Sequence, residues 1–494
     1  MPIHSAPRTG RRAASHALLL SLPLLACVAT PVSARSLREA LVQAYGSNPT
    51  LQAARSGQRA EDENVPIQKS FGRPNASADG SYTEVLVQPS NSFNSPTRSV
   101  DASASLSVPI YSGGAVRNGV KAAKIRVEAG RADLRATEAS VFSSVVAVYM
   151  DVIRDTALVS LNQQNVRVLE VNLQAANDRF EVGDLTKTDV AQSESRLAIA
   201  RSDLQTSMSN LIASKERYIQ QVGEAPDALE VPPPLPGLPA DPDSAVDLAL
   251  SENPDIIAAK KDVEAAGYDV RVVEANRLPT VSAFTRGSYS NYLGTLGSAL
   301  AAGALSQTTK QASAGVSATL PLYQGGRPSA QVRQAQARQS QAMEFEIGTE
   351  RSVIAQVRSA YASWQASEQV IISSQRAVDA ATLSLEGVRA ENSVGSRTIL
   401  DILDAERELL NTKVTLVSAR RNAYVAGFSL LAAMGQAEAG DLGLDGGPLY
   451  DPMMNYNRIK NAWGDWDKDQ SPMPVATRTV DTPAQNANVT SPAE

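Results

Sequence analysis

The sequence predicts a mixed α/β membrane protein in which each of two copies of one unit runs helix, two strands, long helix, turn and helix. The first observation is an internal repeat, since VGDLTKTDVAQSESRL at 182–197 returns as VGSRTILDILDAERELL at 394–410, an offset of 212 residues. Apolar residues that recur every seven positions predict long helices that supercoil on their neighbours. Segments that alternate apolar with small polar residues predict strands of a membrane barrel.

The N-terminal residues 1–34 have the layout of a secretory signal peptide. They combine a basic start, the apolar run ALLLSLPLLACVA and the small-residue site VSA, which ends at Ala34. We expect the mature chain to begin near Arg35. The alternative is a lipoprotein that is cleaved before Cys27 in LLAC.

The composition excludes several kinds of chemistry. Both histidines and the single cysteine lie in the leader, at His4, His16 and Cys27. A mature chain without them has no disulfide framework, ordinary zinc site, Cys nucleophile or His base, so we predict no enzyme, no metal and no cofactor. Only carboxylate or Ser-Lys catalysis stays open. Lys and Arg number 46 against 52 Asp and Glu, and loss of three leader arginines leaves a net charge of about −9. We therefore expect no nucleic-acid partner.

The repeat sets the expected domain organisation. We predict a signal peptide at 1–34, a first repeat at 35–224, a proline-rich linker at 225–243, a second repeat at 244–435 and a tail at 436–494. The linker, APDALEVPPPLPGLPADPD, contains prolines that neither a helix interior nor a central strand accepts. The tail loses periodicity and ends in a stretch typical of disorder, with a second possibility that Trp463 and Trp466 fold back on the middle of the helical region.

Apolar residues spaced by seven predict one rod-like helix before each VG turn. In the two copies these residues are Val145, Val152, Val159, Val166, Leu173 and Phe180, and then Val357, Trp364, Ile371, Val378 and Leu385. A helix from about 115 to 180 would extend nearly 100 Å at about 1.5 Å per residue. The mature chain has no continuous apolar run of the roughly 18 to 20 residues that a membrane helix needs, so strands would have to enter the membrane.

The helix ends carry capping signals at equivalent positions of the two copies. Glycine in each VG turn suits the left-handed residue that closes a helix. A threonine then fits the N-cap of the returning helix, with an aspartate three residues on. An Asn-Pro pair places a capping Asn before Pro at a first helical position. The pairs are Gly183 and Gly395, Thr186 and Thr398, Asp189 and Asp401, and Asn48 and Asn253.

Four segments alternate as strands do. In SVDASASLSVPIY at 99–111, apolar residues from Val100 to Ile110 face one way and Asp101 with three serines the other. The second copy places Ala314, Val316, Ala318, Leu320 and Leu322 on one face. The preceding segments, about 75–87 and 279–292, would complete two hairpins. A membrane barrel has no open edge and needs about eight strands, so four per chain require several chains. A soluble two-sheet module is the alternative.

With these features the sequence resembles the TolC-type outer-membrane channel proteins over nearly the whole mature chain to about Gly435. The match rests on the doubled architecture, the two NP motifs, the linker, the VG turns and the strand-to-helix junctions VPIYSGG and LPLYQGG. The junction residues are Pro109, Gly113, Gly114, Pro321, Gly325 and Gly326. The resemblance implies a homotrimer whose twelve-stranded barrel lies in the lipid of the outer membrane and continues as an α-helical barrel across the periplasm.

The resemblance also implies partners and a gate. A periplasmic adaptor protein would dock at the tips formed by Val182, Gly183, Val394 and Gly395, and an inner-membrane ABC or RND pump would supply the cargo. Arg397, Asp401 and Asp404 match the family's GTRTxxDxxD gate motif, and Asp189 matches the aspartate to which the arginine is expected to bond. A tyrosine often seen three residues before the gate glycine is here Asn392.

The gate aspartates have a second interpretation. Asp189 and Asp401 could act only as helix caps, whereas Asp404 lies one turn further on the face of Asp401 and its repeat partner is the uncharged Gln192. A solvated helix face would account for Asp404 without a gate. For the whole chain we expect an outer-membrane exit duct for protein secretion or drug efflux. The alternatives are a periplasmic coiled-coil scaffold without a pore and, least well supported, a carboxylate hydrolase.

Overall fold

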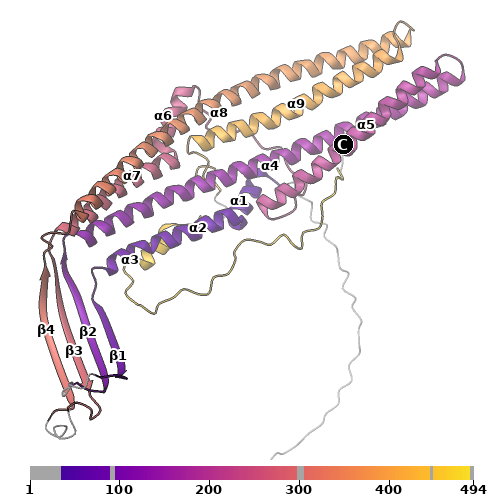
Figure 1. The fold of residues 1–494 in the computed structure, drawn as a ribbon. Coiled ribbons are helices and arrows are strands. Elements are labelled where there is room, and N and C mark those ends of the chain that lie inside the picture. The colour runs from indigo at the N-terminus through magenta and orange to yellow at the C-terminus, as the bar shows by residue number, and fades with distance from the viewer. Residues whose placement is uncertain (1–34, 89–94, 298–304, 445–448, 490–494) are drawn as a thin grey trace, which may run out of the picture.

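The computed structural model describes residues 35–88, 95–297, 305–444 and 449–489, so the expected signal peptide lies outside the described residues. Figure 1 shows an elongated molecule with a sheet at one end and two long helical hairpins that point away from it. The first copy contains α1 (Leu37–Ser47), α2 (Pro49–Asp62), α3 (Asn64–Ser70), β1 (Asn75–Glu84), β2 (Arg98–Ser112), α4 (Ala115–Glu181) and α5 (Lys187–Val222).

The second copy repeats this order. It contains α6 (Pro242–Glu252), α7 (Pro254–Glu274), the short 3-10 helix η1 (Ala275–Arg277), β3 (Thr280–Asn291), β4 (Thr308–Thr319), α8 (Arg327–Ser393) and α9 (Ile399–Ala433). A last helix, α10 (Met453–Ile459), lies in the C-terminal segment. Helices α4 and α8 each span 67 residues, which is about 100 Å at about 1.5 Å per residue, as the sevenfold spacing predicts.

The capping signals have the predicted geometry. Asn48 and Asn253 cap α2 and α7, each accepting hydrogen bonds from the two backbone N–H groups that follow the proline. At the junction between β2 and α4, Gly113 has φ +62°, and a Cβ there would lie 2.8 Å from the carbonyl oxygen of Ala275. Both the backbone conformation and the space therefore require glycine at this position.

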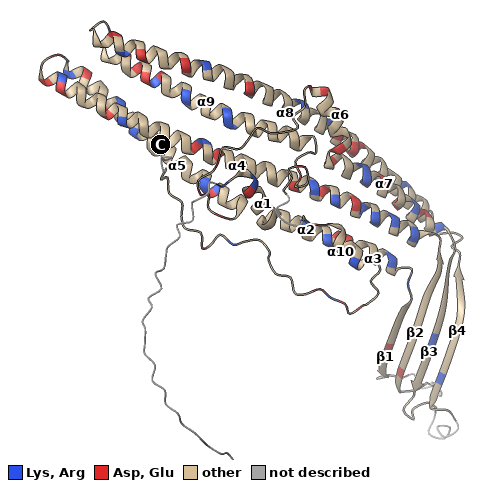
Figure 2. Ribbon diagram, turned by 180° about the vertical axis from the view of Figure 1, so that it is seen from behind, with Lys and Arg blue, Asp and Glu red and all other residues tan. Residues whose placement is uncertain are grey.

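The four strands form one antiparallel sheet in the order β1-β2-β3-β4. The central pairing, for example Ala104 with Gly287, joins the two repeats. Among the described residues the outer edges of β1 and β4 have no strand partner. Figure 2 shows that charged residues are spread along the helices and are few on the strands.

The expected length of the last strand is wrong. Leu320 and Leu322 lie beyond β4, which ends at Thr319, and both are exposed. Pro321 between them has no N–H to donate, so the ladder stops there. In the first copy the ladder passes Pro109 through a register shift between Pro109 and Tyr111, because β3 continues beside it.

The apolar core lies in the helical part. One cluster joins α1, α4, α5 and α9, and a second joins α6, α7, α8 and α9. Helix α4 holds an 18-residue window with mean hydropathy 1.3, long and apolar enough by composition to cross a membrane, but 56% of that window is buried inside the molecule. Val145, Val146 and Tyr149 of α4 are fully buried, so packing against other helices explains its apolar composition.

The C-terminal segment contacts the rest of the molecule at two places. Helix α10 packs on α2, and beyond it the guanidinium of Arg73 lies 4.5 Å from the centre of the Trp463 ring. Where disorder was expected, the chain returns to α5, and Lys215 donates a hydrogen bond of 2.8 Å to the carbonyl oxygen of Asn486. Ala487 is buried in the first core cluster.

Candidate functional site at the hairpin tips

The two VG turns form the exposed ends of the hairpins, opposite the sheet (Figure 1). Gly183 and Gly395 adopt φ +87° and +79°, and a Cβ at either glycine would meet open space. Any other residue would be strained there by its backbone conformation alone. Val182 and Val394 are 74% and 79% exposed. The predicted docking residues thus place an exposed valine at the end of each long helical hairpin.

Asp189 and Asp401 each complete a capping box. One oxygen of Asp189 accepts hydrogen bonds from the N–H of Thr186 at 2.9 Å and from its hydroxyl at 2.7 Å. Asp401 accepts the same pair from Thr398 at 2.8 and 2.7 Å. Hydrogen bonds from the threonine hydroxyl, and then from its N–H, lower the pKa of each carboxyl. Both aspartates are therefore ionised helix caps at neutral pH.

Within the single chain that the structure describes, Arg397 pairs with residues of its own hairpin, and its bond to Asp189 in the closed channel stays a prediction. Its Nε donates to Glu391 Oε2 at 2.8 Å, and its Nη1 lies 3.7 Å from Asp401 Oδ1. Glu391 first, and then Asp401, raise the pKa of the Arg397 guanidinium. Both partners lie on its own tip.

Asn392, which stands where the family often has tyrosine, also bonds within its own turn. Its side-chain amide donates to the carbonyl oxygen of Arg397 at 2.7 Å. The bond fixes the loop between α8 and α9. It makes no link to the other hairpin.

Asp404 forms a link between the two hairpins. Arg196 Nη2 on α5 donates to Asp404 Oδ1 on α9 at 2.7 Å. Both side chains retain contact with solvent, so the pair is an accessible tie. Asp404 is thus neither an isolated carboxylate nor an entirely solvated one.

A buried carboxylate lies half a turn further along α9. Glu406, with only 6% of its side chain exposed, accepts hydrogen bonds from Arg389 Nη2 on α8 and Asn172 Nδ2 on α4, both at 2.9 Å. Beside it Leu403 packs against Val166, Leu169, Leu197 and Ala200. Glu406 therefore joins three helices behind the tips.

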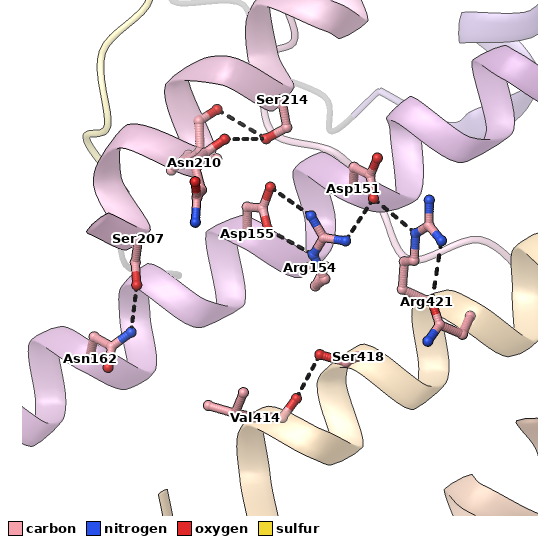
Figure 3. A network of polar contacts seen from close by, with 12 residues as sticks. Asp151, Arg154, Asp155, Asn162, Ser207, Asn210, Ser214, Val414, Ser418 and Arg421 are labelled. Carbon is pink, nitrogen blue, oxygen red and sulfur yellow. Dashed lines mark hydrogen bonds and ion pairs between the residues drawn. The ribbon is translucent and has the colours of Figure 1, made fainter. Parts of the chain in front are cut away.

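A second polar cluster joins the same two hairpins nearer the core (Figure 3). Asp151 Oδ1 on α4 accepts from Arg421 Nε on α9 at 2.8 Å and lies 2.9 Å from Arg154 Nη1. Arg154 also forms a two-pronged contact with Asp155 at 2.7 and 3.0 Å. The contact between α4 and α9 thus includes a charged hydrogen bond at two positions, at Glu406 and at Asp151.

The structure therefore brings together Arg397 and Asp401, leaves Asp189 on the other tip, and gives Asp404 an unpredicted partner. Glu406 and Arg196 were missed. One signal could have indicated Glu406, because it follows Ile402 by four residues and precedes Leu409 by three, a core position of the apolar stripe. In the described ranges no group of His, Cys, Asp and Glu side chains is placed to hold a metal.

Comparison with known proteins identifies the family. The model of the family described as outer membrane efflux protein matches residues 40–221 and 245–436. The outer membrane efflux protein BepC of Brucella suis biovar 1 is 34% identical over 429 residues, covering 87% of this chain and 91% of that protein. The outer membrane protein TolC of Escherichia coli K12 is 28% identical over 463 residues, covering 90% and 93%.

Solved structures show the same fold. The Campylobacter jejuni CmeC outer membrane channel superposes with a TM-score of 0.71 at 17% identity, covering 86% of this chain and 89% of that one. At this identity the likeness supports the architecture of hairpins and sheet. Together with the family match, it shows that the chain belongs to the TolC-type outer membrane efflux proteins, which are non-enzymatic channels of the outer membrane.

Proposed function

We propose that three copies of this chain close one twelve-stranded barrel in the outer membrane and one helical barrel in the periplasm. The observation that carries this proposal is the sheet, whose β1 and β4 edges have no strand partner among the described residues. Open edges are not stable in lipid, because each unpaired backbone group there costs several kcal/mol. Pairing β1 of one chain with β4 of the next removes every edge.

The strands have the chemistry that this arrangement needs. Strand β2 alternates apolar residues, such as Leu106, with serines. In a closed barrel one set would face lipid and the other a water-filled lumen. The scarcity of charge on the strands, visible in Figure 2, agrees with a lipid-facing surface.

The complex would serve as the exit duct of a tripartite export system for proteins, drugs or both. We propose that a periplasmic adaptor engages the tips at Val182, Gly183, Val394 and Gly395, and that an ABC or RND pump in the inner membrane loads the duct. Exposed valines on short turns, flanked by long paired helices, suit a partner that presents a helical hairpin. Support for these partners comes from family membership, and the chain itself does not indicate which class of pump is the partner.

The entrance would be closed by the tips themselves. Under threefold symmetry Asp401 and Asp404, one helical turn apart, become two rings of carboxylates that attract cations. Arg397 orders the tip of its own hairpin, and Asp189 caps the neighbouring one. The Arg196–Asp404 pair ties the two hairpins, so opening must break or exchange it.

Planar-bilayer recording of the purified protein tests this function. We expect a low resting conductance, cation selectivity, and block by multivalent cations added from the periplasmic side. Changing both Asp401 and Asp404 to Ala should weaken selectivity and block while heat-resistant trimers persist. An unchanged reversal potential and unchanged block would contradict the carboxylate rings, and a protein that forms no pore at all would contradict the duct.

A further inference from the structure

The C-terminal segment returns to the junction between the helices and the sheet. Arg73, two residues before β1, donates to the carbonyl oxygen of Ala462, and its guanidinium covers the Trp463 ring at 4.5 Å. Lys69 Nζ donates to the carbonyl oxygen of Lys460 and, at 3.0 Å, to Asn461 Oδ1. Two residues span at most about 7 Å of chain, so Trp463 lies close to the level at which the sheet begins.

Two large aromatic side chains project into solvent at this level. Trp463 is 66% exposed and Trp466 is 96% exposed. Packing within the chain therefore does not account for Trp466, and Trp463 contacts a cation rather than an apolar core. Tryptophan is enriched where a membrane meets water, since its ring is apolar and its N–H is polar.

Four cations surround the same place. Burial first, and then the neighbouring charges of Lys124, Arg73 and Lys460, lower the pKa of Lys69. Within the described ranges none of these four side chains forms an ion pair with a carboxylate. Uncompensated positive charge of this kind favours an anionic partner.

The acidic residues nearby do not neutralise these cations. Arg458 holds Asp469 through two contacts of 2.8 and 2.9 Å, so that carboxylate is already paired. Asp465 and Asp467 flank Trp466 in the chain. Within the described residues neither of these two carboxylates forms an ion pair with the four cations.

We propose that Lys69, Arg73, Lys124, Lys460, Trp463 and Trp466, together the rim patch, anchor the channel to the periplasmic leaflet by binding the headgroups of anionic phospholipids. The tryptophans enter the interface, and the cations contact lipid phosphates beside the barrel. The C-terminal segment thereby becomes a peripheral membrane anchor, a role separate from transport. This inference rests on the proposed insertion of the sheet, because only then does the rim patch lie at a lipid surface.

Intrinsic fluorescence can test the anchor because the chain has only three tryptophans, Trp364, Trp463 and Trp466. Trp364 packs beside Tyr361 and lies about 55 Å along α8 from its first residue, so it stays in the helical region. In the Trp364→Phe protein both emitters belong to the rim patch. The reciprocal Trp463→Phe/Trp466→Phe protein reports only Trp364 and is the control.

Full-length trimer of each protein is reconstituted in phosphatidylcholine vesicles with increasing fractions of brominated phosphatidylglycerol. For Trp364→Phe we expect emission at shorter wavelength than in lipid-free amphipol, and quenching that increases with the brominated fraction. The control should show neither. Lys124→Gln and Lys460→Gln should each weaken the preference for phosphatidylglycerol roughly fivefold, from about 1 kcal/mol per cation. Lys187→Gln, at the hairpin tip where α5 begins and at the far end of the molecule from the sheet, should leave it unchanged.

Protease protection of the strands is measured on the same vesicles to score insertion separately. An inserted, conducting trimer with unquenched, water-like emission would overturn the anchor and leave the proposed function intact. Emission already shifted in amphipol and insensitive to lipid would assign the tryptophans to a contact between subunits instead. A response to peptidoglycan fragments but not to lipid would assign the rim patch to the cell wall. Failure to insert would overturn the proposed function, and this inference with it.

Discussion

Removing the carboxylate of Glu406 should loosen the contact between the two hairpins. Glu406→Ala deletes the acceptor of both Asn172 on α4 and Arg389 on α8, each at 2.9 Å. Because α9 carries Glu406 and also the proposed gate residues, the loss should favour movement of α9 away from α4. The change lies half a turn further along α9 than Asp404 and leaves both gate aspartates in the chain, so the proposed carboxylate rings stay in place.

The magnitude follows from the two bonds. A hydrogen bond to a charged group contributes about 1.5–3 kcal/mol, which applies to Asn172 because Glu406 is buried. The half-exposed Arg389 can return to water, so its pair contributes only about 0.2–1 kcal/mol. Of these two bonds to Glu406, the one from Asn172 joins the two hairpins, whereas the one from Arg389 lies within a single hairpin. Its loss should raise the population of separated hairpins roughly 10- to 100-fold at about 1.4 kcal/mol per tenfold.

Resting conductance in planar bilayers measures this shift. We expect Glu406→Ala to raise the open fraction well above the native value and Asn172→Ala to reproduce most of the effect. The double variant should add little to either change, because both remove one bond. Glu408→Ala, two residues along the same helix and exposed, is the matched control. Equal resting conductance in Glu406→Ala and Glu408→Ala would refute the view that this buried carboxylate holds the entrance closed.

Three further outcomes are expected. A bulky residue at Gly395 should abolish export while trimers persist in the membrane, whereas normal export would exclude that tip as the docking surface. Leu106→Arg should reduce insertion, by about 2–4 kcal/mol if the residue faces lipid near the midplane, as partition between membrane and soluble fractions would show. Because Thr398 lowers the pKa of Asp401, its charge is present above the ordinary pKa of a carboxyl and is lost only as pH falls through the lowered value. Cation selectivity measured against pH should therefore persist to about pH 4, and loss of selectivity near pH 6 would assign it to other groups.

Most of the fold follows from local patterns in the sequence. Apolar residues spaced by seven predict α4 and α8, because they form one helix face that has to be buried whichever element packs on it. Thr398 and Asp401 predict a capping box because all its atoms lie within four residues. The end of β4 could not be read in this way. The alternating pattern continues through Leu322, but Pro321 stops the ladder where no neighbouring strand supports a bulge.

The polar contacts between the two hairpins could not be predicted from local patterns in the sequence. Arg196 and Asp404 are 208 residues apart, and Asn172 and Glu406 are 234 apart. Which of these side chains meet depends on the rotation of each helix and on the lateral packing of the hairpins. For the same reason the sequence did not indicate that Arg397 pairs with Glu391 on its own tip within the chain.

Inter-chain disulfide cross-linking tests the central claim that three chains share one barrel. A chain cleaved after Ala34 contains no cysteine, so an introduced pair is unambiguous. We would place Ala78→Cys on β1 with each of several single cysteines along β4, beginning with Ala314→Cys, to sample the unknown register between chains. Ala104→Cys/Gly287→Cys, which are direct partners within one chain, provide the intramolecular control.

After oxidation in outer-membrane fractions, the account predicts covalent trimers on a non-reducing gel for at least one β1–β4 pair, and monomers for the control. Trimers should return to monomers on reduction. A β1–β4 series that yields only monomers at every register, with or without an internal cross-link, would contradict a barrel shared between three chains.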